Sequence, residues 1–326
     1  MTVRGRGGVM RRRGLVFAAL GLVSLTLVSC AAPHEQDPPA LSVTAAPDPV
    51  ADDAKRRLAE LTLTDKVASL LMLHQPGTDA AALRSFAAGY GLGGLILMRD
   101  NIPGSAGAMR AMTAAASVDP DLPLLIGIDQ EGGEVSRMAD DLALGADALR
   151  SLPPQAAQDA FRSRSTLLRS VGVNVNFGIV ADVTADPQSF LYGRVLGTDP
   201  DSASDRVAAA VAGEQGQVLS TLKHFPGHGA APGDSHRSIP VTPLGYRDWM
   251  AREAPPFRAG IAAGAEVVMF GLLTYSSVDQ QPAGLSPVWH DILRSKLGFT
   301  GVTITDDMLM LQHSGRPEYA DPVENA

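Results

Sequence analysis

Cysteine is nearly absent from this chain of 326 residues, which contains only one. A single cysteine cannot form a disulfide within the chain, so a disulfide framework is excluded as its source of stability. The sequence also lacks internal repeats at solenoid or propeller periods, which excludes those architectures. With 45% hydrophobic residues, the chain can bury a full core, as one large α/β domain or as two smaller domains.

Basic residues are scarce beyond the N-terminus. Residues 1–30 contain five of the 27 basic residues and none of the 35 acidic ones, which leaves the remainder with a formal charge of −13. Such an acidic surface is unfavourable for nucleic acid, and we expect no nucleic-acid partner.

The N-terminus has the features of an export signal. Arg11, Arg12 and Arg13 precede the apolar run "GLVFAALGLVSLTLV", which is too short for a comfortable membrane span. The following "LVSC" resembles the lipobox of bacterial lipoproteins, in which Cys30 would be lipidated. We therefore expect a signal peptide over 1–30 and a protein anchored by lipid to the extracytoplasmic face of the cell membrane. An uncleaved signal anchor with an incidental cysteine is the alternative.

Two further regions follow this signal. Residues 31–52 contain five prolines and show no apolar periodicity, which predicts an extended tether. The folded domain is expected over 53–326.

Short apolar runs alternate with helical stretches in this domain. Several runs are almost entirely apolar, as expected for parallel strands that are buried on both faces. This alternation favours a TIM barrel over a doubly wound sheet without excluding the latter. The expected strands are 68–73, 93–98, 123–129, 173–180, 218–225, 266–272 and 301–306, and helices are expected at 199–216 and 284–298.

Polar residues stand at or just beyond the carboxyl ends of these strands. They are Asp129, Asn176, Lys223, His224 and Asp306. In a β/α barrel this rim is where the active site is assembled, so the sequence predicts that these side chains share one site.

Four stretches together form a recognisable set: "LTLTDKVASLLML" (61–73), "GIDQEGGEVSR" (127–137), "KHFPGHGAAPGDSH" (223–236) and "LGFTGVTITDDM" (297–308). They resemble glycoside hydrolase family 3, and specifically its β-N-acetylglucosaminidase branch. The resemblance implies a (β/α)8 TIM barrel and a retaining glycosidase that removes terminal β-linked N-acetylglucosamine from cell-wall fragments. It implies a carbohydrate partner and no cofactor, and we expect the protein to be a monomer.

Retaining glycoside hydrolysis needs a carboxylate that attacks the anomeric carbon and a second group that protonates the leaving oxygen. By resemblance Asp306 is the nucleophile, although a role as a helix N-cap would suit either Asp306 or its neighbour Asp307. The resemblance also makes His236 the general acid/base and Asp234 its orienting partner. Their i, i+2 spacing allows the carboxylate to hold the imidazole.

Other interpretations of the histidine-rich stretch are weaker. A metal site would use His224, His228 and His236, but the spacing matches no metalloprotease motif and Lys223 is a poor neighbour for a cation. A phosphate-binding loop is disfavoured because "GHGAAPG" matches no P-loop. We expect no metal, and we interpret His228 as a residue that shapes the loop.

The resemblance assigns sugar binding to residues from three stretches. They are Asp129, Arg137, Arg194, Lys223 and His224. An ion pair that closes a surface loop is the alternative for Asp129 and Arg137, and the flanking residues of Arg194 follow the family pattern only loosely.

The sequence departs from the family pattern at two places. Glu134 stands where the motif commonly has arginine, which could alter the affinity for acidic muramyl groups. After Asp306 the family pattern requires one more helix and an eighth strand, whereas twenty residues remain. We therefore expect a barrel that is truncated before its eighth strand.

Two rival functions remain open on the sequence. A histidine acid/base tolerates phosphate better than a carboxylate does, so the enzyme could be a glycoside phosphorylase. The chain could instead be a surface sugar-binding lipoprotein without turnover.

Overall fold

The computed structural model describes residues 48–117, 119 and 121–325. The chain divides into two compact units, Met1–Asp53 and Ala54–Ala326. The signal peptide, Cys30 and nearly all of the predicted tether lie outside the described residues. The first helix, α1 (Pro49–Glu60), contains the boundary between the units, and the fold described below belongs to the second unit.

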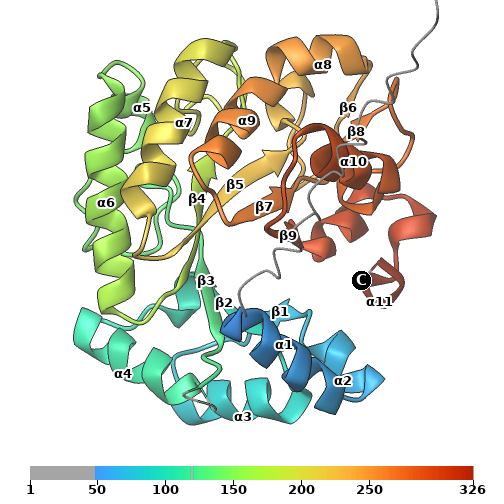
Figure 1. Ribbon diagram of the computed structural model, residues 1–326. Coiled ribbons are helices and arrows are strands. Elements are labelled where there is room, and N and C mark those ends of the chain that lie inside the picture. Colours follow the sequence, from blue (N-terminus) through green and yellow to red (C-terminus); the bar gives the residue numbers. More distant parts are fainter. Residues whose placement is uncertain (1–47, 118, 120, 326) are drawn as a thin grey trace, which may run out of the picture. The chain divides into compact units, whose positions relative to one another are not determined.

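A seven-stranded parallel sheet forms the centre of this unit, and its strands follow one another in chain order (Figure 1). The strands are β1 (Met72–Leu73), β2 (Gly94–Leu97), β3 (Leu125–Ile128), β4 (Val175–Val180), β5 (Leu219–Phe225), β7 (Val267–Phe270) and β9 (Val302–Thr305). All seven expected strands are confirmed. The first is shorter than expected, because the helix α2 (Leu63–Ala68) ends at Ala68 and residues 69 and 70 form the turn that follows it.

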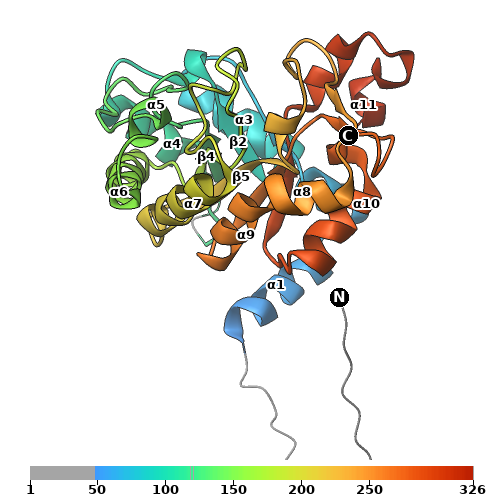
Figure 2. The same cartoon turned by 90° about the horizontal axis from the view of Figure 1, so that it is seen from above.

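Helices cover the outer face of the curled sheet. Helices α6 (Pro154–Ser170), α7 (Pro200–Glu214) and α9 (Ala254–Ala262) pack side by side, as Figures 1 and 2 show. Every residue of β4 is buried, because these helices cover one face and the interior of the curl covers the other. The interior contains Phe177, Val175 and Met269.

Helix α7 begins as its sequence predicts. The Asp199 carboxylate accepts a hydrogen bond from the Ser202 amide, and Pro200 occupies the first turn, where its missing amide hydrogen costs nothing. The helix expected at 284–298 is only partly regular, because it divides into η3 (Ala283–Leu285), α10 (Pro287–Asp291) and one π-helical turn, η4 (Ile292–Lys296).

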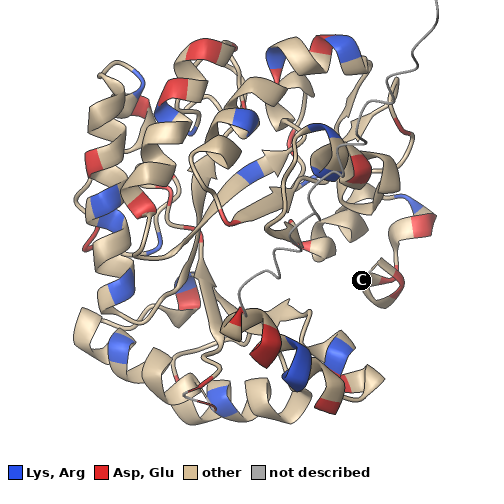
Figure 3. Cartoon of the chain, viewed as in Figure 1, with Lys and Arg blue, Asp and Glu red and all other residues tan. Residues whose placement is uncertain are grey.

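The remaining helices lie in the connections or complete the outer layer. They are α3 (Ala80–Tyr90), η1 (Arg99–Asn101), α4 (Ala106–Ala116), α5 (Ala146–Leu149), η2 (His228–Ala230), α8 (Tyr246–Arg252), η5 (Met308–Ser314), η6 (Pro317–Tyr319) and α11 (Pro322–Asn325). Acidic and basic residues are both distributed along the outer helices in the view of Figure 3. No helix within 48–117 or 121–325 is long and apolar enough to cross a membrane.

A second, two-stranded sheet was not expected from the sequence. Strand β6 (Val241–Thr242) pairs in parallel with β8 (Thr274–Tyr275). Each strand has only two residues, which is too few for an apolar alternation to be recognised.

The described sheet does not close into an eight-stranded barrel. Within the described residues β1 pairs only with β2, and β9 pairs only with β7. The α/β class and the parallel order that the resemblance implies are confirmed, whereas the (β/α)8 closure is not seen.

Candidate active site

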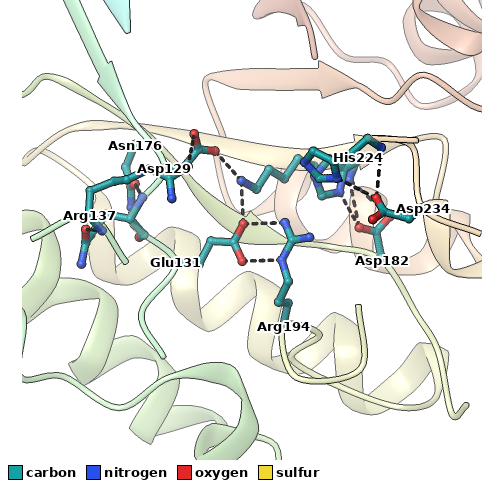
Figure 4. A network of polar contacts seen from close by, with 11 residues as sticks. Asp129, Glu131, Arg137, Asn176, Asp182, Arg194, His224 and Asp234 are labelled. Atoms are coloured by element: carbon teal, nitrogen blue, oxygen red, sulfur yellow. Dashed lines mark hydrogen bonds and ion pairs between the residues drawn. The ribbon is translucent and has the colours of Figure 1, made fainter. Parts of the chain in front are cut away.

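The candidate site lies at the carboxyl ends of β3, β4 and β5, where the loops after these strands meet (Figure 4). Asp129 follows β3, Asp182 lies just beyond β4, and Lys223 and His224 lie near the carboxyl end of strand β5. Because the strands are parallel and adjacent, their carboxyl ends share one edge, so residues far apart in the sequence meet there.

Lys223 is the centre of a buried ionic network. Its Nζ lies 2.7 Å from Asp129 Oδ1 and 2.7 Å from Glu131 Oε1. The Arg194 guanidinium donates to both oxygens of Glu131, from Nε at 2.9 Å and from the second nitrogen at 2.7 Å (Figure 4). Such bidentate geometry fixes the orientation of the Arg194 guanidinium relative to the Glu131 carboxylate.

The charged groups of this network stabilise one another in their ionised forms. Burial would raise the pKa of Glu131, but Lys223 and Arg194 lower it to about 2. Burial would likewise lower the pKa of Lys223, but Asp129 and Glu131 raise it above its usual value. Sequence reasoning assigned no role to Glu131, although its place in "DQEGG" two residues after Asp129 was a usable signal. Glu131 holds the two predicted sugar-binding cations in place.

Asp129 and Arg137 form the more open part of the network. The Arg137 guanidinium lies 3.4 Å from Asp129 Oδ2, and the side chains are 14% and 18% exposed. The ion pair that the sequence left as an alternative is therefore present. Asp129 also bonds Lys223, however, so the pair belongs to the polar network and does not simply close a surface loop.

His224 is held by a buried carboxylate. Its Nδ1 lies 2.7 Å from Asp182 Oδ2, and the other Asp182 oxygen accepts the His228 amide at 2.6 Å. Burial would raise the pKa of Asp182, but His224 lowers it below its usual value. Asp182 thereby joins the end of β4 to the start of the loop after β5.

Asp234 and His236 form a second, exposed pair on that loop. His236 Nδ1 lies 2.7 Å from Asp234 Oδ1, which also accepts the His236 amide at 3.0 Å. Burial would raise the pKa of Asp234, but the hydrogen bonds from His236 lower it. The i, i+2 spacing therefore produces the contact that the sequence predicted.

The two neighbouring aspartates after β9 differ in their contacts. Asp307 Oδ1 accepts the Leu309 amide at 2.9 Å and caps η5. Asp306 is partly exposed, and among the described residues its carboxylate accepts only the adjacent Asp307 amide, at 2.8 Å. The N-cap interpretation therefore applies to Asp307, and Asp306 is left free for another role.

The remaining histidine of the loop, His228, is buried, and its ring packs edge to face against Phe190. Both ring nitrogens lack a hydrogen bond in the part of the chain that the structure describes, and burial lowers the pKa of the ring. Among the described residues no group of three or more His, Cys, Asp or Glu side chains is arranged to hold a metal ion.

The structure thus brings four of the five predicted sugar-binding residues into one network and places His224 next to it on β5. Asp306 and the Asp234–His236 pair lie on separate loops. The Asp306 carboxylate accepts the Asp307 amide and its own amide donates to the Phe270 carbonyl at the end of β7, whereas the Asp234 carboxylate bonds His236.

Comparison with known proteins assigns the family. Residues 62–326 match the glycosyl hydrolase family 3 N terminal domain. A β-hexosaminidase of Stenotrophomonas maltophilia is 33% identical over 253 residues, which cover 74% of this chain and 75% of that protein.

Solved structures agree with this assignment. A family 3 β-N-acetylglucosaminidase from a Paenibacillus species superposes with a TM-score of 0.74 at 30% identity; the match covers 82% of this chain and about half, 53%, of that one. A family 3 glycosyl hydrolase from Mycobacterium smegmatis gives a TM-score of 0.68 at 32% identity, with coverages of 77% and 78%. The chain belongs to glycosyl hydrolase family 3, and it is a glycosidase.

Proposed function

We propose that this glycosidase is a β-N-acetylhexosaminidase that removes terminal β-linked N-acetylglucosamine through a covalent intermediate on Asp306. Relatives named β-hexosaminidase and β-N-acetylglucosaminidase support the sugar specificity. The observation that carries the mechanism is the exposed Asp234–His236 pair, joined at 2.7 Å. It supplies a proton donor outside the buried ionic network, as a second catalytic group requires.

In the first half of the reaction, Asp306 attacks the anomeric carbon while His236 donates the proton from Nε2 to the leaving oxygen. Asp234 accepts the Nδ1 hydrogen, so it fixes the ring orientation and stabilises the protonated imidazole. In the second half, the neutral Nε2 accepts a proton from water, which then attacks the glycosyl-aspartate and regenerates both residues.

The buried network orients the sugar. Asp129 accepts hydrogen bonds from hydroxyl groups, and Lys223, Arg137, Arg194 and His224 donate to or orient the remaining polar groups. Because Glu131 and Asp182 already hold these side chains, little conformational entropy is lost when the sugar binds.

A fluorinated N-acetylglucosaminyl substrate that traps the intermediate tests this proposal. We expect one covalent label, located on Asp306 by peptide mass mapping, and we expect Asp307→Ala to retain it. A label on another residue would overturn the nucleophile assignment. Binding of N-acetylglucosamine without release of any aglycone would instead favour a sugar-binding protein.

The acceptor is tested with an ordinary N-acetylglucosaminide that turns over, because an imidazole acid/base does not repel phosphate as a carboxylate does. We expect added inorganic phosphate to leave the product as free N-acetylglucosamine. Formation of a glycosyl phosphate would identify a phosphorylase.

The proposal also includes where the enzyme acts. The sequence pattern before Cys30, which lies outside the described residues, supports a lipid anchor on the extracytoplasmic face and cell-wall fragments as substrates. We expect Cys30→Ser to release the protein from the membrane fraction or to leave its signal uncleaved. Wild-type protein that is found soluble and free of lipid would contradict the anchor.

A further inference from the structure

Gln130 is a buried polar residue between two members of the ionic network, Asp129 and Glu131, and its relative exposure is 0%. The β4 residue Asn176 holds its main chain. Asn176 Oδ1 accepts the Gln130 amide, and Asn176 Nδ2 donates to the Gln130 carbonyl, each at 3.2 Å. Asn176 is itself buried, and its Nδ2 also donates to Glu214 Oε1 on α7 at 2.6 Å. The strand end that carries Asp129 and Glu131 is therefore fixed by contacts that do not involve the Gln130 side chain.

The Gln130 side chain instead bonds the loop that carries Arg137. Its Oε1 accepts the amides of Arg137 at 2.8 Å and of Met138 at 3.0 Å. Its Nε2 donates to Ser136 Oγ at 2.6 Å and to Asp141 Oδ2 at 2.8 Å. Both amide hydrogens and both lone pairs are thus used. One side chain therefore holds this loop at four points.

A buried ion pair joins the same loop to the outer helix α6. Asp141 Oδ2 also accepts Arg164 Nε at 2.6 Å, and these side chains are 2% and 0% exposed. The Arg164 guanidinium donates to the Leu144 carbonyl at 3.1 Å as well. It packs so closely under the loop that a Cβ at Gly132 would overlap it. The far side of the loop is therefore fixed, and the Gln130 bonds determine where the near side lies.

Arg137 differs from Arg194 in what holds its guanidinium. Glu131 bonds Arg194 at two points, whereas Arg137 has a single side-chain contact among the described residues, 3.4 Å from Asp129. Arg137 Nε is buried and has no partner in that part of the chain. In Figure 4 the Arg137 side chain lies at the same end of the network as Asp129. The direction of this guanidinium therefore depends on its backbone, and the Gln130 side chain bonds that backbone.

We propose that Gln130 is a positioning residue for sugar binding, because its side chain holds the Arg137 backbone where the guanidinium can reach a sugar bound beside Asp129. This rests on the proposed function, in which Arg137 and Asp129 bind the sugar. Loss of the Gln130 side chain displaces Arg137 and leaves Asp129 in place, since Asn176 bonds only the main chain of residue 130.

A double-mutant cycle tests this coupling. Gln130→Met keeps the length of the side chain and removes its four hydrogen bonds, and Arg137→Ala removes the guanidinium. With the full chain and a chromogenic N-acetylglucosaminide, we expect Gln130→Met alone to lower kcat/KM by about tenfold, because a small displacement of a binding group is costly. In the Arg137→Ala background the same change should lower kcat/KM by less than about twofold, because no guanidinium remains to be displaced.

Asn174→Leu is the matched control. Asn174 is also an amide that bridges two strands, but it lies at the amino end of β4, where it accepts the Ile126 amide at 2.7 Å and donates to the Leu124 carbonyl at 3.0 Å. We expect this variant to lower the melting temperature, as Gln130→Met does, and to leave kcat/KM within about twofold of the wild type. A purely structural role for Gln130 would make the two variants behave alike.

Gln130→Asn is a milder variant for the case in which Gln130→Met does not fold. It keeps both polar groups on a side chain that is one methylene shorter, so the bonds to the loop are stretched. We expect kcat/KM to fall by about threefold, and we expect this effect also to disappear in the Arg137→Ala background. A folded Gln130→Asn protein with the kcat/KM of the wild type would contradict the proposal.

The remaining outcomes separate this proposal from the proposed function. If Gln130→Met lowers kcat/KM equally with and without Arg137, Gln130 acts by another route and the positioning role is overturned. An Arg137→Ala variant as active as the wild type would overturn it as well. Wild-type protein that neither binds N-acetylglucosamine nor releases the aglycone would refute the proposed function itself.

Discussion

Two aspartate–histidine pairs stand at the two ends of the same loop, and their geometry is the same while their surroundings differ. In each pair the histidine Nδ1 lies 2.7 Å from a carboxylate oxygen. The His224 and Asp182 side chains are 8% and 0% exposed, whereas those of His236 and Asp234 are 62% and 30% exposed. The distance between histidine and carboxylate therefore does not distinguish the roles of the two pairs.

Burial decides what each pair can do. Asp182 also accepts backbone amides from the loop, so the inner pair is part of the fold and holds His224 in one orientation. In the outer pair, Asp234 accepts the amide of its own partner, His236, so both residues are held on one loop, and the glycines at 227 and 233 of this loop have φ of 126° and 107°, which other residues rarely adopt. An exposed imidazole on such a loop can exchange protons with solvent and with a leaving group. In the mechanism proposed above, the inner pair positions a sugar ligand and the outer pair performs proton transfer.

The largest effect is expected from breaking the inner pair. Asp182→Asn places an amide NH₂ group against the donors of His224 and His228, so a buried group is left unsatisfied. We expect a loss of about 3 kcal/mol in the free energy of unfolding and a nearly complete loss of activity. Chemical denaturation and a chromogenic N-acetylglucosaminide assay measure both. A variant as stable as the wild type would show that the inner pair has no structural role.

Breaking the outer pair should affect chemistry alone. His236→Ala removes the proton donor, so we expect a loss of about 10²–10⁴-fold for substrates with poor leaving groups and a far smaller loss for activated aryl glycosides. The stability should change by less than about 0.5 kcal/mol, as for an exposed substitution. Equal losses for good and poor leaving groups would contradict the acid/base assignment.

The sequence could predict the strands but not how the sheet is completed. The seven apolar runs are confirmed because burial on both faces leaves an uninterrupted apolar pattern in each. Strands β6 and β8 were missed because the loops that contain them position them, and their own two-residue sequences do not. The π-helical turn at 292–296 was missed for a similar reason, since its sequence suits an ordinary helix.

The same limit applies to the site. Asp234 and His236 could be paired from the sequence because they are two residues apart. Asp182 and Glu131 could not be assigned their partners, because each bonds a residue more than forty positions away. Such long-range contacts depend on which strands are neighbours, and only the folded sheet determines that.

Glu253, a buried acid next to the loop after β5, should make the stability of the protein depend on pH. Glu253 lies against Gly227, its Oε2 lacks a partner among the described residues, and burial raises its pKa to about 8. Between pH 4.5 and 8 the folded state therefore binds a proton that the unfolded state has released. The stability from this group is complete below about pH 4.5 and is lost as the pH rises through about 8.

Glu253→Gln keeps the shape of the side chain and removes its titratable carboxyl group. We expect the variant to be more stable than the wild type at pH 8 by roughly 2 kcal/mol, with little difference at pH 5. Thermal melts across this range measure the change, and Glu318→Gln, at an exposed position, should follow the wild type. Parallel stability curves for Glu253→Gln and the wild type would show that Glu253 is not protonated in the folded protein.

The smallest effect is expected from Asp234→Asn, which changes the outer pair without removing its histidine. The pKa of Asp234 is lowered in the folded state, so its stabilising contribution is present above about pH 3.8 and is lost as the pH falls through the lowered value. Because Asp234 is 30% exposed, solvent screens this contribution, and we expect no measurable change in stability at pH 7.

Catalysis should respond more clearly than stability to Asp234→Asn. Without the carboxylate, the imidazole loses the partner at 2.7 Å that orients its Nε2 toward the leaving oxygen, so the alkaline limb of the pH–rate profile should change. We expect turnover of poor leaving groups at neutral pH to fall by about tenfold, and the inner pair to be unaffected, so that binding of N-acetylglucosamine is unchanged. A profile that keeps its alkaline limb would mean that Asp234 shapes the loop and does not tune its histidine.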